Sequence, residues 1–400
     1  MKSLSARIPR IEESLPVPLI KRAQEMRSAG IDIVNLTVGD PDFPTPPHVK
    51  AAAIQAIDED FTHYTPVEGI PALIDAIIEK FKRDNNLHFD RAQVLVSTGS
   101  KQSLYNTLLA LCNPDDEVII PAPHWMRYVP MVRLAGARPV IMPTSADDGF
   151  KVSAKQLRQT INARTKVLIF NSPCNPTGAV YSQGEIEELA DVVRQTGIYV
   201  ISDEIYEKII FDTAKHFSIG SIKEIRDQVI TVNGVSKVFA MTGWRIGYLG
   251  GPEEIVRAAA KVQKQTTSGA NSIAQRAAVA ALNGPQGEVE AMRAELQRRR
   301  DFVDEEFSKI PGLEFVKPRG AIYCFPSLRA FVGKHVGGTL MKSGEDICRF
   351  LLEEEHVAIL PGALLGDRNR ARITFAVDWK DLQKGVERLR SGFKKLAEAN

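Results

Sequence analysis

The chain has 400 residues, 44% of them hydrophobic and 25% charged, and its 51 Lys and Arg residues nearly balance 49 Asp and Glu residues. This length exceeds what one core usually supports, so we expect two domains. A formal net charge of +2 without blocks of like charge argues against nucleic acid or an anionic membrane as a partner. No apolar run is long enough to span a bilayer and the N-terminus lacks an apolar signal-peptide centre, so we expect a cytoplasmic protein.

The first strong element is an amphipathic helix over Pro71–Lys82, whose apolar residues form one stripe. Short apolar runs then alternate with helices such as Ser103–Cys112 and Glu185–Gln195. Because the runs are continuous, they predict strands buried on both faces of a mostly parallel, seven-stranded sheet between helices, an α/β fold. The runs are Val94–Val96, Val118–Ile120, Val140–Met142, Val167–Phe170, Tyr199–Ile201, Val229–Val232 and Ile246–Leu249.

Beyond residue 285 the pattern changes to that of a smaller α+β domain. A long charged helix, Glu290–Lys309, is expected to connect the two domains. It is followed by predicted strands, a helix and a last amphipathic helix ending near Leu396. We expect a large domain over residues 46–290 and a small domain over residues 291–400, with residues 1–45 joining the small domain. The elements between the two helices are Leu313–Val316, Ala321–Phe325, Asp346–Glu354 and Ala371–Val377.

Cysteine and histidine spacing gives no sign of disulfides or metal. Cys112, Cys174, Cys324 and Cys348 form no CxxC pair, so free thiols are expected. The seven histidines form no HExxH or similar pattern, so we expect no metal site.

Polar loops follow several predicted strands, at the edge where open α/β sheets bind ligands. Thr98–Gln102 brings small residues to a helix start and suggests an anion site, although Ser100 could simply cap the helix. Asn171–Gly178 forms a rigid turn that presents the amide of Asn175, although an ordinary Asx turn is an equal alternative.

Two further loops carry charge. Asp203 ends a predicted buried strand, where a carboxylate needs an arginine or a cationic ligand, and Tyr206 lies within reach. Lys237, beside Ser236, is either a solvated surface lysine or, if burial lowers its pKa, a nucleophile for carbonyls. Taken together, the loops suit a ligand with a phosphate, a cation, a ring oxygen and an aldehyde. Pyridoxal phosphate has all four groups.

The chain resembles the fold-type I, class I pyridoxal-phosphate aminotransferases, most closely the branch of bacterial aspartate and prephenate aminotransferases. The resemblance covers nearly the whole sequence. It rests on the ordered motifs LTVGDPDFPTP, HYTPVEGIPALIDAI, STGSKQ, NSPCNPTGAVY, SDEIYE, SKVFAMTGWRIGY and ARITFA.

This resemblance implies a set of cofactor contacts. Lys237 would bind the cofactor aldehyde covalently and later carry the proton between the substrate α-carbon and the cofactor. Asp203 would pair with the pyridine nitrogen, Asn175 and Tyr206 would bond the ring oxygen, and Trp125 would stack on the ring. The phosphate would be held by Gly99, Ser100 and Lys101 through their backbone, by Ser236 and Arg245, and by Tyr64 of a neighbouring subunit.

The resemblance also implies substrate contacts. Arg372 would clamp the substrate α-carboxylate, helped by the backbone of Gly39, with Trp125 and Asn175 close to the substrate. Lys101 is either a solvated lysine at a helix start or, as a lysine at this place in the resembled branch can do, a contact for the distal carboxylate of a dicarboxylic substrate.

One departure from the family concerns that distal carboxylate. The other main branch of aspartate aminotransferases uses an arginine of the partner subunit, but Ala258–Gln275 here contains no arginine. Recognition must then rest on Lys101, on the segment near Ser14, or on Lys261 or Lys264; otherwise the substrate is not a dicarboxylate.

The implied function is transfer of the amino group from L-aspartate to 2-oxoglutarate in a ping-pong reaction by an obligate homodimer. Prephenate or aromatic amino acid transamination is the near alternative, and a β-lyase on a sulfur amino acid is a second. A regulator fused to a DNA-binding module is a third, but about forty residues before the matched region are too few for a helix-turn-helix domain.

Overall fold

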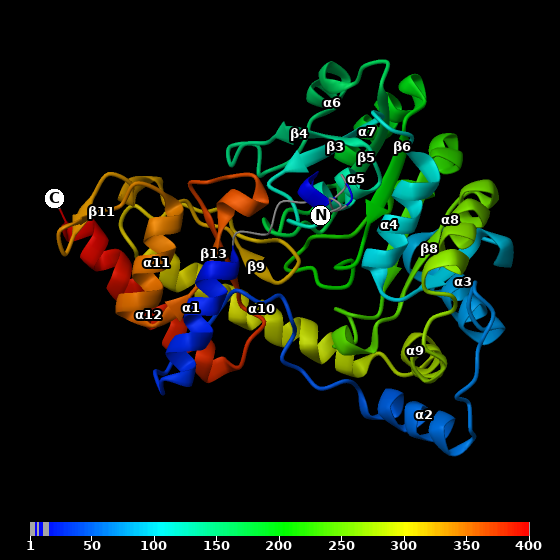
Figure 1. Cartoon of the computed structure of the whole chain (residues 1–400), viewed down its shortest axis with the longest axis horizontal. Coiled ribbons are helices and arrows are strands. Elements are labelled where there is room, and N and C mark those ends of the chain that lie inside the picture. The colour runs from blue at the N-terminus through cyan, green and yellow to red at the C-terminus, as the bar shows by residue number, and fades with distance from the viewer. Residues whose placement is uncertain (1–4, 6–7, 11–15, 400) are drawn as a thin grey trace.

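The computed structural model describes residues 5, 8–10 and 16–399, and a seven-stranded sheet lies at its centre (Figure 1). The strand order is β2-β8-β7-β6-β5-β3-β4. Only β8 runs antiparallel to its neighbours, so the predicted mostly parallel sheet is confirmed, and each predicted run contributes to one strand. The strands are β2 Val94–Ser97, β3 Glu117–Ala122, β4 Arg138–Pro143, β5 Thr165–Asn171, β6 Tyr199–Asp203, β7 Val229–Gly234 and β8 Gly247–Gly250.

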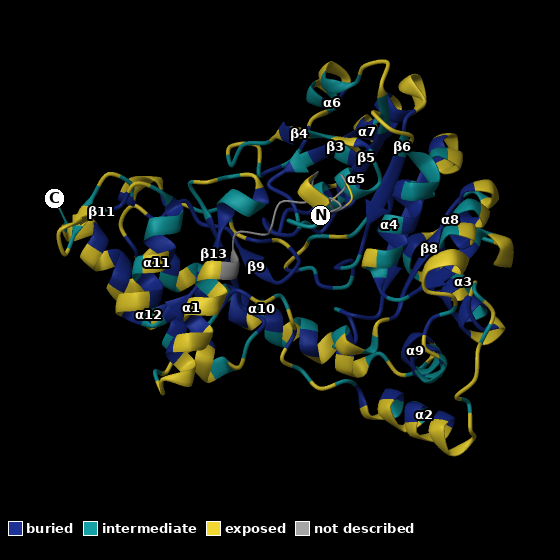
Figure 2. Ribbon diagram, viewed as in Figure 1, coloured by how far each residue is buried: buried dark blue, intermediate teal, exposed yellow. Residues whose placement is uncertain are grey.

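The central strands are buried on both faces (Figure 2). Along β5, Val167 and Ile169 join the core under α4, α5 and α8, whereas Leu168 and Phe170 join the core under α6 and α7. Successive strand residues point to opposite faces, so a strand covered by helices on both sides is apolar at every position. The helices of this part are α2 Pro47–Asp58, α3 Pro71–Asn85, α4 Ser100–Leu111, α5 Tyr128–Leu134, α6 Ala154–Thr160, α7 Gln183–Thr196, α8 Glu253–Thr266 and α9 Ser272–Asn283.

The remaining elements form a smaller α+β part, joined to the sheet by the long helix α10, Gly287–Ser308 (Figure 1). Its sheets are the antiparallel β13-β14-β9, the parallel pair β1-β12 and the hairpin β10-β11. Because β1 pairs with β12, we propose that residues 1–45 belong with residues 291–400, and residues 46–290 form the large domain. The elements are α1 Pro16–Ser28, β1 Val34–Asn35, β9 Tyr323–Cys324, β10 His335–Val336, β11 Thr339–Leu340, α11 Gly344–Glu355, β12 Val357–Ala358, β13 Leu360–Pro361, β14 Ala371–Thr374 and α12 Trp379–Glu398.

One predicted strand is wrong and two are shorter than expected. Leu313–Val316 forms no strand: the Phe315 ring packs against Phe307 of α10 at 6.0 Å, so its apolar pattern reflects helix packing. The predicted strand at residues 371–377 ends at Thr374, where its hydroxyl accepts a hydrogen bond from the Ala376 N–H. The strand predicted over residues 321–325 keeps only Tyr323 and Cys324. No helix in the described part of the chain has the length and apolar character needed to cross a membrane.

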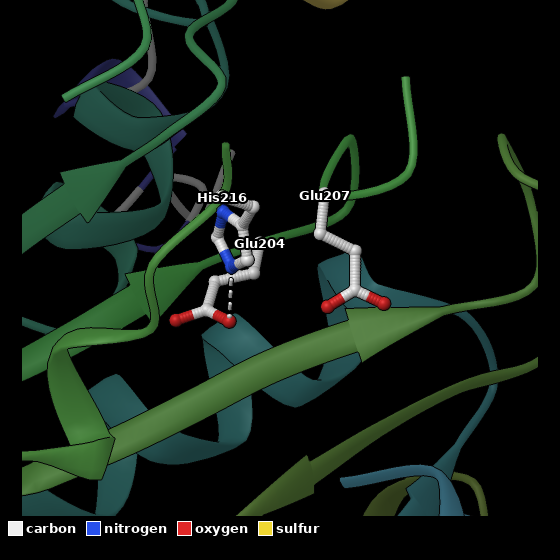
Figure 3. Close-up of side chains that lie close together, drawn as sticks. All are labelled: Glu204, Glu207 and His216. Atoms are coloured by element: carbon white, nitrogen blue, oxygen red, sulfur yellow. Dashed lines mark hydrogen bonds and ion pairs between the residues drawn. The ribbon is translucent and has the colours of Figure 1, made fainter. Parts of the chain in front are cut away.

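A buried ion network joins the carboxyl end of β6 to α3, and Figure 3 shows three of its members, Glu204, Glu207 and His216. Glu204 accepts a hydrogen bond from His216 Nε2 at 2.9 Å, and Glu207 pairs with the ammonium group of Lys80. Asn85 bonds both carboxylates, at 3.0 and 2.6 Å. Burial disfavours the charge of His216, but the neighbouring Glu204 outweighs it, so the pKa of His216 lies above its ordinary value.

The network neutralises its own charges. Ligand atoms of Glu204, Glu207 and His216 lie within 4.8 Å of one another, a spacing that also occurs in metal sites. Here the carboxylates already bond Lys80 and Asn85. Although burial opposes it, the cations Lys80 and His216 hold the pKa of Glu207 below its usual value. We therefore assign the cluster to stability, because it fixes the turn that follows β6.

Replacing Lys80 by Met tests this assignment. The substitution leaves Glu207 buried without its cation, so we expect the free energy of unfolding to fall by about 3–5 kcal/mol. Urea denaturation followed by circular dichroism measures the change. Lys82→Met, on the exposed side of the same helix, is the matched control and should leave the midpoint unchanged. Equal midpoints for the two variants would contradict the assignment.

Candidate active site

A cavity of about 390 Å³ lies where the carboxyl ends of the sheet strands face β9, β13 and β14. Its size is typical of a small-molecule site. Of the residues singled out in the sequence, Gly39, Ser100, Lys101, Trp125, Asn175, Asp203, Tyr206, Ser236, Lys237, Arg245 and Arg372 line it. Gly99 lies directly behind this lining, and the side chain of Tyr64 is fully exposed and does not line the cavity.

The start of α4 forms one end of the cavity. Its N-cap is Gly99, with φ of 83° and no side-chain cap, and a Cβ there would collide with the guanidinium of Arg245. The alternative that Ser100 caps the helix is wrong. Its hydroxyl instead donates a hydrogen bond to the carbonyl of Asn233 at 2.9 Å. An uncapped helix start beside an arginine offers backbone N–H groups and positive charge to an anion.

Asp203 lies at the carboxyl end of β6 and is 5% exposed. Its Oδ2 accepts a hydrogen bond from the Tyr128 hydroxyl at 2.7 Å, and its Oδ1 has a longer contact of 3.4 Å to the Ile205 N–H. Burial raises the pKa of Asp203 to about 6. Among the described residues no Lys, Arg or His ion pair neutralises this carboxylate, so it suits a cationic group of a ligand.

Arg372 projects from β14 and is 3% exposed. Its Nη1 donates to Asn175 Oδ1 at 3.0 Å, and its Nη2 donates to the Thr37 carbonyl at 2.6 Å. Its Nε is buried without a hydrogen-bond partner in the described structure. A buried guanidinium with an unused donor suits a carboxylate ligand.

The contact between Arg372 and Asn175 also directs the Asn175 amide. The amide oxygen is used by the arginine, which leaves Nδ2 as the donor for a ligand oxygen. Tyr206 shares a 2.8 Å hydrogen bond with the Tyr323 hydroxyl, and burial raises the pKa of Tyr206. Both groups therefore reach the cavity as neutral hydrogen-bonding groups.

Lys237 follows β7 and is half-buried. Its Nζ donates to the main-chain carbonyl of Gly39 at 2.5 Å. Gly39 has no room for a side chain, because a Cβ would collide with the hydroxyl of Tyr323. The loop at Gly39 is thus packed between an amine and a phenol, both of which line the cavity.

Lys101 is the one lysine among the distal-carboxylate candidates that lines the cavity in the described chain. Its Nζ lies 5.5 Å from the centre of the Trp125 ring. Partial burial and the charges of Arg127 and Arg245 lower the pKa of Lys101. Lys261 and Lys264 are exposed on α8 and do not line the cavity, and Ser14 lies outside the described residues.

The sequence did not single out several residues of the cavity lining, among them the polar side chains of Arg127, Tyr128 and Tyr323. Arg127 and Tyr128 follow Trp125 in PAPHWMRY, so their closeness to a singled-out aromatic residue was the available signal. Tyr323 lies in the predicted strand Ala321–Phe325, whose apolar residues indicate core packing. Its hydroxyl was the only sign that it could also bond another polar group.

Comparison with known proteins agrees with this geometry. Residues 31–389 match the family described as aminotransferase class I and II. The chain is 43% identical over 393 residues to a bifunctional aspartate aminotransferase and glutamate/aspartate-prephenate aminotransferase of Petunia hybrida, covering 97% of this chain and 82% of that one. It is also 43% identical to an aspartate/prephenate aminotransferase of Cereibacter sphaeroides, covering 98% of both chains.

Solved structures are similar over the whole chain. The aspartate aminotransferase of Rhizobium meliloti matches with a TM-score of 0.96 and 39% identity, over 99% of this chain and 100% of that one. The Thermus thermophilus aspartate aminotransferase with maleate matches with a TM-score of 0.92 and 38% identity, over 98% and 100% of the two chains.

The buried carboxylate of Asp203 predicts that binding of a cationic ligand depends on pH, and pyridoxal phosphate, the cofactor that the resemblance implies, is the probe. As the pH falls through about 6, the carboxylate gains a proton and loses its attraction for a cationic group, so the apparent affinity should fall. Fluorescence titration between about pH 5 and about pH 8 measures it. The Asp203→Asn protein should bind pyridoxal phosphate weakly at every pH in this range. Any remaining change of its affinity with pH reports the titration of the ligand itself. Parallel curves for the two proteins would contradict the role of Asp203.

Proposed function

Because the chain belongs to the aminotransferase class I and II family, we propose that it is a pyridoxal-phosphate-dependent aspartate aminotransferase. It transfers the amino group from L-aspartate to 2-oxoglutarate in a ping-pong reaction, giving oxaloacetate and L-glutamate. The observation that carries the proposal is the cavity shared by Lys237 and the buried Arg372, an amine and a carboxylate receptor. We place the reaction in the cytoplasm.

The residues of the cavity fit pyridoxal phosphate. When bound, it supplies an electron sink and carries the amino group between the two half-reactions. Asp203 would accept from the ring nitrogen, and Asn175 Nδ2 and the Tyr206 hydroxyl would bond the ring oxygen. Trp125 would pack on the ring. The phosphate would be held at the start of α4 by Gly99, Ser100 and Lys101 through their backbone, and by Ser236 and Arg245.

The substrate is held at its two ends. Arg372, which lines the cavity, binds the α-carboxylate through its guanidinium group, beside the loop at Gly39. Lys237 lines the same cavity, and its amine takes the proton from the substrate α-carbon. Lys101, near the Trp125 ring, binds the distal carboxylate.

Two comparisons support a dicarboxylic substrate. The Thermus thermophilus relative was solved with maleate, a dicarboxylate. The Petunia and Cereibacter relatives are named for both aspartate and prephenate. Prephenate, itself a dicarboxylate, is therefore the second candidate acceptor for the same site.

We also propose that the protein acts as a homodimer, in which Tyr64 reaches the phosphate of the neighbouring subunit. The fully exposed side chain of Tyr64 supports this, as do Ile54 and Ile57 of α2, which are 60% and 53% exposed. A mass of 44.2 kDa in sedimentation equilibrium, that of one chain, would refute the dimer.

The amino donor is tested by mixing the pyridoxal phosphate form with single amino acids and recording absorbance. L-Aspartate alone should bleach the cofactor band, because the first half-reaction needs no acceptor, and 2-oxoglutarate or prephenate should restore it. Lys237→Ala should stay folded and show no change with any donor. A response to aromatic donors only would overturn aspartate, and pyruvate with ammonia released in the absence of an oxo acid would indicate a β-lyase.

Lys101→Met tests the distal carboxylate. Loss of a charged hydrogen-bond donor should lower kcat/KM for L-aspartate about tenfold to hundredfold. The value for L-phenylalanine, which has no distal carboxylate, should change little. Lys155→Met, exposed on α6, is the control and should match the unmodified protein with both donors. An equal loss for both donors would show that Lys101 does not read the distal carboxylate.

A further inference from the structure

Tyr128 is a buried residue of the cavity wall whose role the proposed function leaves open. It is the first residue of α5 and is 2% exposed. Its ring stands edge-on to Trp125, with the centres 5.4 Å apart and the planes at 85°. Its hydroxyl donates to Asp203 Oδ2 at 2.7 Å. One side chain therefore contacts both the aromatic residue and the carboxylate assigned to the cofactor ring.

The direction of this hydrogen bond is fixed by protonation. Burial raises the pKa of Tyr128 well above its ordinary value, and the charge of Asp203 raises it further. The phenol therefore keeps its proton and is the donor, while the carboxylate is the acceptor. At 2.7 Å the distance suits an O–H···O bond to a carboxylate.

The bond also decides which carboxylate oxygen is available. Oδ2 is used by Tyr128, whereas Oδ1 has only the 3.4 Å contact to the Ile205 N–H, which is longer than an ordinary hydrogen bond. Oδ1 is therefore the oxygen that can accept a strong hydrogen bond from a ligand. Rotation of the carboxylate would break the bond to Tyr128, so the phenol fixes its orientation.

Asp203 differs in this respect from the two acidic residues that follow it. Glu204 bonds His216, and Glu207 pairs with Lys80, so each has a nearby cation. Among the described residues, the strongest contact of Asp203 is with a neutral phenol. A neutral donor stabilises the carboxylate without supplying the charge that the ligand must bring.

We propose that Tyr128 is a positioning residue, which holds the Asp203 carboxylate ionised and directed at the ring nitrogen of the cofactor while bracing Trp125 against the ring face. The proposal rests on the proposed function, because it takes pyridoxal phosphate as the ligand. It goes further, because it assigns the ionisation and orientation of Asp203 to a residue outside the cofactor contacts named above.

Tyr128→Phe removes the hydroxyl and keeps the ring, and the readout is pyridoxal phosphate affinity against pH. Without the donor, Asp203 should take up its proton more readily, so the pH midpoint of binding should rise by about one unit. At about pH 6 the apparent Kd should then increase roughly fivefold, because the ionised fraction falls from about one half to about one eleventh. Tyr181→Phe is the matched control: it removes another buried phenol, which accepts from the Val152 N–H, and should not move the midpoint.

Two further variants test the same hydrogen bond. In a protein that already carries Asp203→Asn, Tyr128→Phe should not change how pyridoxal phosphate affinity depends on pH, because the carboxylate on which Tyr128 acts is absent. Site-specific 3-fluorotyrosine at position 128 keeps the side chain nearly unchanged but makes the phenol a stronger donor, so the midpoint should move down. This second substitution still tests the proposal if Tyr128→Phe does not fold.

The outcomes separate the proposal from its premise. A Tyr128→Phe protein that binds less tightly by the same factor at every pH has lost packing only, and would overturn the positioning role. An unchanged midpoint with fluorotyrosine would also overturn it. If the unmodified protein shows no midpoint near pH 6, the assignment of Asp203 and its cofactor fails first.

Discussion

Burial of acidic residues at the end of β6 is the constraint on which the site depends. Asp203, Glu204 and Glu207 follow one another within the motif SDEIYE, and all are at most 5% exposed. Buried carboxylates require compensation. The protein compensates the two glutamates itself, through His216 and Lys80. Asp203, in contrast, lines the cavity and, within the part of the chain that the structure describes, has only neutral hydrogen-bond donors, the Tyr128 hydroxyl and the Ile205 N–H. The ion network holds the turn after β6 and so fixes the position of the Asp203 carboxylate.

The cavity lining also carries the complementary charge. Arg372 is buried with an unused Nε, and Lys237 contacts a main-chain carbonyl rather than a carboxylate. The start of α4 adds N–H groups beside Arg245. The cavity lining thus carries both signs of charge, and a ligand with a cationic ring nitrogen, a phosphate and a carboxylate satisfies both.

The strands of the central sheet could be predicted from the sequence because the pattern that marks a buried strand lies within a few consecutive residues. Runs such as Val167–Phe170 are apolar at every position, which only a strand covered on both faces requires. The candidate site could be assembled from the sequence because residues that follow neighbouring parallel strands meet at one edge of the sheet. Asp203, Asn175 and Lys237 could therefore be grouped, and they line one cavity. The strand predicted at Leu313–Val316 is wrong because an apolar pattern does not distinguish pairing in a sheet from packing on a helix.

Other features could not be predicted because they depend on long-range contacts. Ser100 looked like a helix cap, but its hydroxyl bonds Asn233, a residue 133 positions away. Tyr323 looked like core, yet it meets Tyr206 across 117 positions. Arg372 and Asn175 meet across 197 positions, and this bond joins the smaller α+β part to the central sheet without any ligand. This bond holds the Arg372 guanidinium in place at the cavity, so a ligand that binds there need spend little of its binding energy on ordering this side chain.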